Sequence, residues 1–173
     1  QMHIHIEESI ISLSNNVINQ FYIDAVLIKA AYLIEAGHIT QGLDILEETY
    51  TLVFQMSDLK LGRLKLLFEI IECYYKKEQY FTCRRLLDQF SYLKESMKIH
   101  YRQDEYLLLF SKVAAGEQDF ELLDSLVKMT DSSGMTLLKC FNMYKKDQIK
   151  EAVELFKGYQ KNTDELKVDP LMT

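Results

Sequence analysis

A few residues in the sequence are of types that suit catalysis or metal binding. His3 and His5 are two residues apart, so both imidazoles would face one side of an extended segment. A structural zinc ion needs about four ligands, and no other Cys or His lies nearby in the sequence. Acidic pairs occur at 7–8 and 47–48, and we interpret them as solvated helix-surface residues. We therefore expect no catalytic residue, no metal site and no cofactor.

The three cysteines, Cys73, Cys83 and Cys140, are odd in number and far apart in the sequence. This favours reduced thiols over a disulfide framework. Cys73 and Cys83 are expected on the two helices of one hairpin, where a redox or metal-binding pair is the alternative. We interpret Cys83 and Cys140 as core residues, because a free Cys behaves as a small hydrophobe.

Arginines and lysines recur near the predicted helix turns and present two alternatives. They could form one basic face for an acidic partner, or they could simply keep the turns soluble, which is the interpretation we favour. The residues concerned are Arg84, Arg85, Arg102, Lys76, Lys77, Lys145 and Lys146.

The composition is that of a helical globular domain. The chain has 173 residues, 48% hydrophobic and 27% charged, which is typical of folded domains. Only one proline and six glycines interrupt it, which favours helices over strands and turns. The net charge of −6, without a basic stripe, argues against direct nucleic-acid binding. No apolar run approaches the roughly 20 residues of a membrane span, so we expect no membrane partner and a cytoplasmic location.

Apolar residues recur at helical spacing along most of the chain. They predict a leading helix within 1–20, from the end of a preceding repeat, about four helical hairpins over 21–161, and a polar tail over 162–173. The eight hairpin helices are expected at 21–37, 41–56, 63–77, 80–97, 104–116, 119–129, 135–146 and 149–161. Thr40 is expected to cap one helix, Ser57 or Asp58 another, and 131–134 to form a loop. Such short connections make neighbouring helices antiparallel, in either a closed bundle or a stack of hairpins.

Four segments of the chain share one pattern. The same five-residue motif, Tyr-Lys-Lys followed by an acidic residue and Gln, begins at Tyr75 and again at Tyr144. Related segments surround Gly37 and Gln118. After each turn we expect a bulky residue to plug the hairpin end, a smaller one to let the helices cross, and a bulky one to pack on the next hairpin. In chain order these residues are Ile39, Gly42 and Leu46; Tyr80, Cys83 and Leu87; Phe120, Leu123 and Val127; and Ile149, Ala152 and Phe156.

This pattern resembles the tetratricopeptide repeat over roughly 21–161. The matching positions are Gly37, Ile39, Gly42, Leu46 and Thr49 in the first copy and Ala152, Phe156 and Tyr159 in the last. The copies are 41, 40 and 29 residues apart, whereas the family's period is about 34. The family's Trp and repeat-ending Pro are missing, and Ile71 replaces the small residue that Ala30 and Ser111 supply elsewhere. The resemblance implies an all-α fold, a right-handed superhelical stack of antiparallel helical hairpins (an α-solenoid).

The resemblance also implies a non-catalytic module that binds a peptide or protein segment. The irregular, Tyr-, Ile- and Lys-rich repeats are similar to the C-terminal halves of quorum-sensing peptide receptors of Gram-positive bacteria. There, such repeats bind a short peptide and report to an N-terminal DNA-binding or effector segment. Because Gln1 is not an initiator residue, we expect the C-terminal sensor part of a larger transcriptional regulator. The alternatives are an assembly scaffold or chaperone-like adaptor without a signalling ligand, and an enzyme with an unrecognised helical site.

The expected binding surface is the concave groove, which the first helix of each hairpin lines in such stacks. Tyrosines there would give contact area and a hydroxyl, as peptide-binding surfaces often do. An exposed end of the stack is a candidate surface for homodimerisation. The predicted groove residues are Glu35, Glu72, Tyr75, Lys76, Lys112, Tyr144 and Lys145, with Leu27, Phe68 and Leu108 deeper.

Overall fold

The computed structural model describes residues 18–129 and 133–167 of the chain. These residues form eight α-helices and one 3₁₀-helix, which confirms the all-α prediction. The chain divides into two compact units, Gln1–Tyr101 and Arg102–Thr173. Most of the predicted leading helix and the His3–His5 pair lie outside the described residues.

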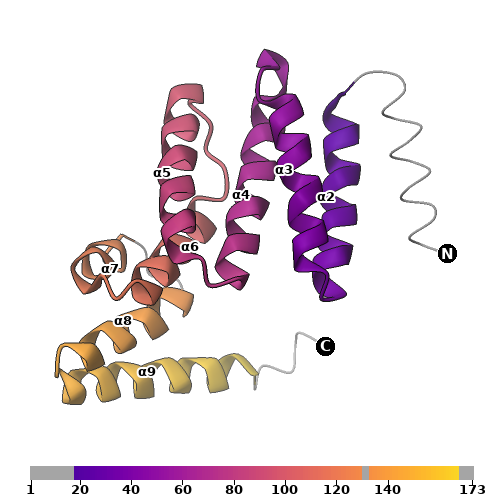
Figure 1. The fold of residues 1–173 in the computed structure, drawn as a ribbon. Helices are drawn as coiled ribbons and strands as arrows, with labels where there is room; N and C mark the ends of the chain where they lie inside the picture. The colour runs from indigo at the N-terminus through magenta and orange to yellow at the C-terminus, as the bar shows by residue number, and fades with distance from the viewer. Residues whose placement is uncertain (1–17, 130–132, 168–173) are drawn as a thin grey trace. The chain divides into compact units, whose positions relative to one another are not determined.

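The first unit contains two helical hairpins (Figure 1). Helix α2 (Gln20–Glu35) is antiparallel to α3 (Ile39–Val53), and α4 (Lys60–Lys76) is antiparallel to α5 (Tyr80–Met97). The short 3₁₀-helix η1 (Ser57–Leu59) joins the hairpins. Helix α4 packs on both α2 and α3, so the first hairpin is covered by the first helix of the second.

The second unit repeats this arrangement. Helix α6 (Gln103–Gly116) pairs with the short α7 (Phe120–Leu126), and α8 (Ser133–Lys145) pairs with α9 (Ile149–Lys167). Helix α8 packs on both α6 and α7. The sequential antiparallel pairs predicted from the short connections are therefore present in each unit.

The core of the first unit is a stripe of apolar side chains from α2, α3 and α4. Complete burial of one such aliphatic side chain contributes about 1.5–3 kcal/mol to stability. This burial stabilises the hairpins, which short helices could not achieve alone in water. The cluster comprises Ile23, Val26, Ala30, Leu43, Leu46, Val53, Leu66, Ile70 and Cys73.

Each hairpin turns at one residue with a left-handed backbone. These residues are Gly37, Glu78, Gln118 and Asp147, with φ of 87°, 56°, 61° and 59°. In every turn this residue donates its N–H to the carbonyl three residues before it, and the next residue donates to the carbonyl five residues before it. The pattern satisfies the last carbonyls of the first helix, as in a Schellman motif. It recurs at the four predicted positions, so the alignment of the four copies is confirmed.

The two helices of a hairpin cross closely at the predicted small residue. A Cβ added to Gly42 would lie 2.8 Å from Ile34 Cγ1 and 3.1 Å from the Ala30 carbonyl oxygen. In the second hairpin the buried Cys83 occupies the same position, and its Sγ donates to the carbonyl of Ile71 at 3.6 Å. Ala30 and Ile71 both lie seven residues before their left-handed residue, so these are equivalent crossings.

Three local predictions are wrong. Thr40 does not cap α3, which begins at Ile39 after His38 and has no side-chain cap, because the backbone bonds of the turn already fix its start. Ser57 and Asp58 form η1, so α4 follows Leu59 instead of either predicted cap. Ser133 and Gly134, expected in a loop over 131–134, instead lie in the first turn of α8. An added Cβ on Gly134 would be 2.9 Å from Leu108 Cδ1, so its small size serves packing on α6.

The last copy also departs from the predicted packing. Ile39, Tyr80 and Phe120 are partly buried at the hairpin ends, but Ile149 is 53% exposed. Helix α9 continues to Lys167, beyond the expected end at 161.

Replacing Gly37 by Ala should lower the free energy of unfolding by about 1 kcal/mol, because left-handed backbone costs an L-residue that much. A Cβ at Gly37 meets nothing within 4 Å, so the cost is conformational alone. Glu78→Gly should raise the free energy of unfolding by a similar amount. Urea unfolding of both variants tests the turn; a fall for Glu78→Gly would contradict it.

Replacing Gly42 by Leu should lower the free energy of unfolding by about 1–3 kcal/mol, because overpacking pushes α2 and α3 apart. The matched control is Gly158→Ala on α9, where an added Cβ meets nothing within 4 Å. That control should stabilise by about 0.5–1 kcal/mol through helix propensity. Equal stabilities of Gly42→Leu and the parent chain in urea would show that the crossing is not tight.

Candidate functional site

A pocket opens on the first unit between α3, α4 and α5. Its volume is about 270 Å³, and it combines an apolar floor with a polar rim. The floor is formed by Leu67, Ile70 and Leu86, and the rim by Glu47, Tyr50, Thr51, Tyr74, Thr82 and Arg85.

Two residues of the rim are joined by a short hydrogen bond between two helices. The hydroxyl of Tyr74 on α4 donates to Glu47 Oε1 on α3 at 2.6 Å. This bond, with burial and the carboxylate charge, raises the pKa of Tyr74 to about 12, because a phenolate would face the Glu47 carboxylate. Tyr74 therefore stays protonated and occupies one acceptor oxygen of Glu47.

Tyr50 forms a second polar link, between α3 and α5. Gln89 Nε2 donates to the Tyr50 hydroxyl oxygen at 3.1 Å, so the Tyr50 proton is left to donate elsewhere. Burial raises the pKa of Tyr50, partly offset by the Arg63 charge and the Gln89 hydrogen bond.

Two further rim residues on α5 have unused hydrogen-bond donors. Thr82 and Arg85 form no hydrogen bond or ion pair with the part of the chain that the structure describes. Thr51, by contrast, uses its hydroxyl on the carbonyl of Glu47 at 2.9 Å. The pocket thus offers the donors of Tyr50, Thr82 and Arg85 above an apolar floor.

The predicted groove residues of the first unit lie elsewhere. Glu35 and Lys76 are exposed at the ends of α2 and α4, and Glu72 is partly buried. Tyr75 is partly buried, with its ring centroid 5.9 Å from that of Tyr80, and burial raises its pKa. Residues two apart on a helix point in nearly opposite directions, so Lys76 lies on the other side of α4 from Tyr74 and the pocket.

The predicted groove residues of the second unit are all exposed. Lys112 lies on α6, and Tyr144 and Lys145 lie near the end of α8. Lys145 Nζ lies 5.5 Å from the centre of the Phe141 ring.

The three residues expected deeper in the groove mainly serve packing. Phe68 is fully buried and its ring meets the Phe90 ring at a centroid distance of 5.7 Å, so it offers no surface to a ligand. Leu27 packs against the core of the first unit, and Leu108 packs against Gly134.

The cysteines behave as core residues. Cys73 and Cys83 are buried free thiols, Cys140 is a partly buried one, and burial raises the pKa of Cys73 to about 11. Residues 18–129 and 133–167 hold no group of three His, Cys, Asp or Glu residues placed to bind a metal ion.

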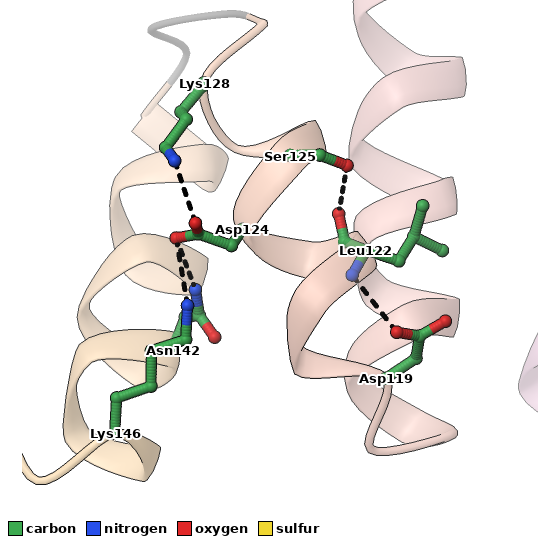
Figure 2. A network of polar contacts seen from close by, with 7 residues as sticks. All are labelled: Asp119, Leu122, Asp124, Ser125, Lys128, Asn142 and Lys146. Carbon is green, nitrogen blue, oxygen red and sulfur yellow. Dashed lines mark hydrogen bonds and ion pairs between the residues drawn. The ribbon is translucent and has the colours of Figure 1, made fainter.

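A polar cluster in the second unit ties α7 to α8 (Figure 2). Asp124 accepts from Lys128 Nζ at 2.8 Å and from Asn142 Nδ2 at 3.1 Å, and Lys146 Nζ lies 3.3 Å away. The hydrogen bonds from Lys128 and Lys146 lower the pKa of Asp124. Because three donors already surround this carboxylate, we interpret the cluster as structural. Lys146, which was considered above as part of a basic face, is paired with Asp124 in this cluster.

Comparison with solved structures establishes what this arrangement is. The chain is similar to two crystal structures of the nearly identical TPR-like repeats of a Podosopora anserina protein assigned as a kinesin light chain. One of them, a variant form, gives a TM-score of 0.72 and 14% identity over 94% of this chain and 85% of that one. The other gives a TM-score of 0.71 and 14% identity over 95% and 86%. The chain has a tetratricopeptide-repeat-like (TPR-like) fold. No family model and no curated protein sequence matches it.

The TPR-like fold explains why the sequence did not predict the pocket. The sequence pattern predicts Glu47 and Arg85 as solvated surface residues, because the groove is expected only on the first helix of each hairpin. The pocket instead uses the second helices, α3 and α5, with α4 beneath them. The hint in the sequence is the pair of polar residues Glu47 and Tyr50, one turn apart beside the packing residues of α3. Among the described helices of this TPR-like chain, none combines the length and apolarity required to cross a bilayer.

Replacing Glu47 by Gln should bring the pKa of Tyr74 down from about 12 towards the ordinary value of about 10, because the facing charge is lost. Titration of ¹³C-labelled tyrosine by NMR measures this, and Tyr50, whose pKa is raised by burial, should not follow. Since the folded-state pKa is the higher one, the stabilisation is present below about pH 10 and is lost as the pH rises through about 12. An unchanged pKa of Tyr74 would contradict its contact with the Glu47 carboxylate.

Proposed function

We propose that this chain is a non-catalytic module that binds a peptide or a segment of a partner protein. TPR-like repeat modules are generally protein-binding. The observation that carries the proposal is the pocket of α3, α4 and α5, with an apolar floor and the Arg85 guanidinium, which has no hydrogen-bond or ion-pair partner in the described chain. Small-molecule sites usually have volumes of about 300–1,000 Å³, so this smaller pocket suits one side chain.

The donors around the pocket favour a carboxylate as the anchoring group. Arg85, Thr82 and Tyr50 have hydrogen-bond donors free, while Glu47 already accepts from Tyr74. An arginine–carboxylate hydrogen bond is among the stronger ones in proteins. Either an Asp or Glu side chain or a chain-terminal carboxylate supplies this chemistry.

The groove residues predicted from the sequence form a second proposed contact surface. These residues include both acidic and basic side chains, so they do not indicate whether the ligand is positively or negatively charged. In the first unit these residues are Glu35, Glu72, Tyr75 and Lys76, and in the second they are Lys112, Tyr144 and Lys145.

For the biological role, we propose the cytoplasmic sensor part of a larger bacterial transcriptional regulator. The support is the similarity of the irregular Tyr-, Ile- and Lys-rich repeats to quorum-sensing peptide receptors. The alternative is a scaffold or adaptor without a signalling ligand. A helix-turn-helix segment encoded upstream would support the regulator, and its absence from the full-length gene would support the scaffold.

Binding to an array of short synthetic peptides, measured by fluorescence anisotropy, tests the proposal. Binders should be enriched in acidic side chains or free C-termini, and paired peptides with amidated ends or Asn and Gln distinguish these two sources. Arg85→Gln should weaken binding about tenfold, or about 1.4 kcal/mol. The control Lys60→Gln makes the same charge change at an exposed position outside the pocket and should leave affinity unchanged.

The same assay separates the two surfaces. If Tyr75→Ala and Lys76→Gln weaken binding and Arg85→Gln does not, the ligand lies on the predicted groove residues. Failure of every peptide to bind, together with capture of no partner by the full-length protein, would overturn the proposed function.

A further inference from the structure

Helix α2 has a second apolar side, away from the core of the first unit. Phe21 is 74% exposed, Ile28 59% and Tyr32 37%, and Ala25 is partly exposed. These four residues follow the spacing i, i+4, i+7 and i+11, which places them on one side of this single helix. We call them the outer stripe of α2. The side of α2 that packs on α3 and α4 is the opposite one, with Ile23, Val26, Ala30 and Leu33.

The leading helix predicted within 1–20 carries a stripe of the same spacing. Its apolar residues at i, i+4, i+7 and i+11 are Ile6, Ile10, Leu13 and Val17, all of which precede the described residues. In a helix these four share one side, whereas Ile11 points about 100° away from Ile10. The sequence thus supplies, directly before α2, an apolar stripe as long as the outer stripe.

The two stripes match each other in one antiparallel register. Asn19 caps the start of α2, because its side chain accepts the N–H of Tyr22 at 3.0 Å. A helix that ends just before Asn19 therefore has a short connection to α2, and short connections make neighbouring helices antiparallel. A pairing centred on Asn19 places Val17 opposite Phe21, Leu13 opposite Ala25, Ile10 opposite Ile28, and Ile6 opposite Tyr32.

The described hairpins of the first unit pair in the same symmetric way. Ala30 lies at the Gly42 crossing, and Cys83 Sγ donates to the Ile71 carbonyl. In each pair the two residues lie six positions before and six positions after the residue that ends the first helix, Ala36 or Lys77. A register centred on a helix-terminal residue is therefore the geometry that this chain already uses.

We propose that residues 6–17 form a helix that packs on the outer stripe of α2 in this antiparallel register. The segment is attached to α2 through Ile18, whose side chain packs against the core of the first unit. A tethered segment has a far higher effective concentration at the stripe than a second copy of the chain. The first hairpin is then covered by the chain's own helix and is not a homodimer surface. The proposal does not rest on peptide binding in the pocket.

Engineered cysteine pairs in the full chain test the register. Ile10→Cys combined with Ile28→Cys should form an intramolecular disulfide on mild oxidation, because residues that face each other on packed helices approach disulfide geometry. The matched pair, Ile11→Cys with Ile28→Cys, should form at least about fivefold less of its bridge, since its thiol points away from α2. Mass spectrometry of unreduced digests measures both bridges, and the parent chain with its three free cysteines gives the background. Equal yields from the two pairs, or no bridge from either, would overturn the proposal.

Single substitutions test whether the predicted stripe is buried against α2. Ile10→Asp should lower the Tm of the full chain by at least about 2 °C more than Ile11→Asp, because only the first places a charge in an apolar contact. The two variants make the same change at neighbouring positions, so an effect on helix propensity cancels. Thermal unfolding followed by circular dichroism measures the difference, and equal Tm values for the two variants would contradict the packing.

The same variants distinguish a second copy as the occupant. If the bridge between positions 10 and 28 appears only in covalent dimers on non-reducing gels, the outer stripe belongs to a dimer interface and the proposal is wrong. Ile10→Asp should leave the affinity of the pocket for acidic peptides unchanged, so failure here is distinct from failure of the proposed function.

Discussion

The hairpins of this chain depend on one backbone constraint, the left-handed residue that ends the first helix of each pair. At Gly37, Glu78, Gln118 and Asp147 the chain reverses while two backbone N–H groups satisfy carbonyls of the preceding helix. Since these bonds also set the start of the second helix, they fix which residues of the pair face each other. This backbone is unfavourable for a non-glycine residue, and burial of the hairpin core offsets the cost.

From that fixed pairing follows the close crossing, and from the crossing follows the pocket. Gly42 and Cys83 let α3 and α5 approach the helices before them. Each helix then presents a defined side to its neighbours, so Glu47 meets Tyr74 and Gln89 meets Tyr50. The polar contacts that shape the pocket are therefore a consequence of packing. They join residues 27 and 39 positions apart in the sequence, and no local motif encodes them.

Repetition has a second consequence, at the end of the repeats. The position nine residues after the turn carries a large apolar residue in every copy, and it is buried in the first three, at Leu46, Leu87 and Val127. In the last copy, Phe156 keeps the residue type but is 40% exposed. The same residue type that stabilises the interior of a repeat array is thus left partly exposed on the last hairpin that the structure describes.

The sequence by itself determined the helices, the four turns and the small residues at the crossings, because these depend on helical periodicity, breakers and side-chain volume. It did not determine the starts of α3 and α4, because backbone bonds and a 3₁₀-helix override the side-chain caps expected at Thr40, Ser57 or Asp58. Nor could it distinguish the buried Phe68 from a groove residue, because both lie on the first helix of a hairpin. Only the tertiary structure decided which polar residues meet, since the Glu47–Tyr74 pair depends on how α3 and α4 pack across 27 residues of sequence.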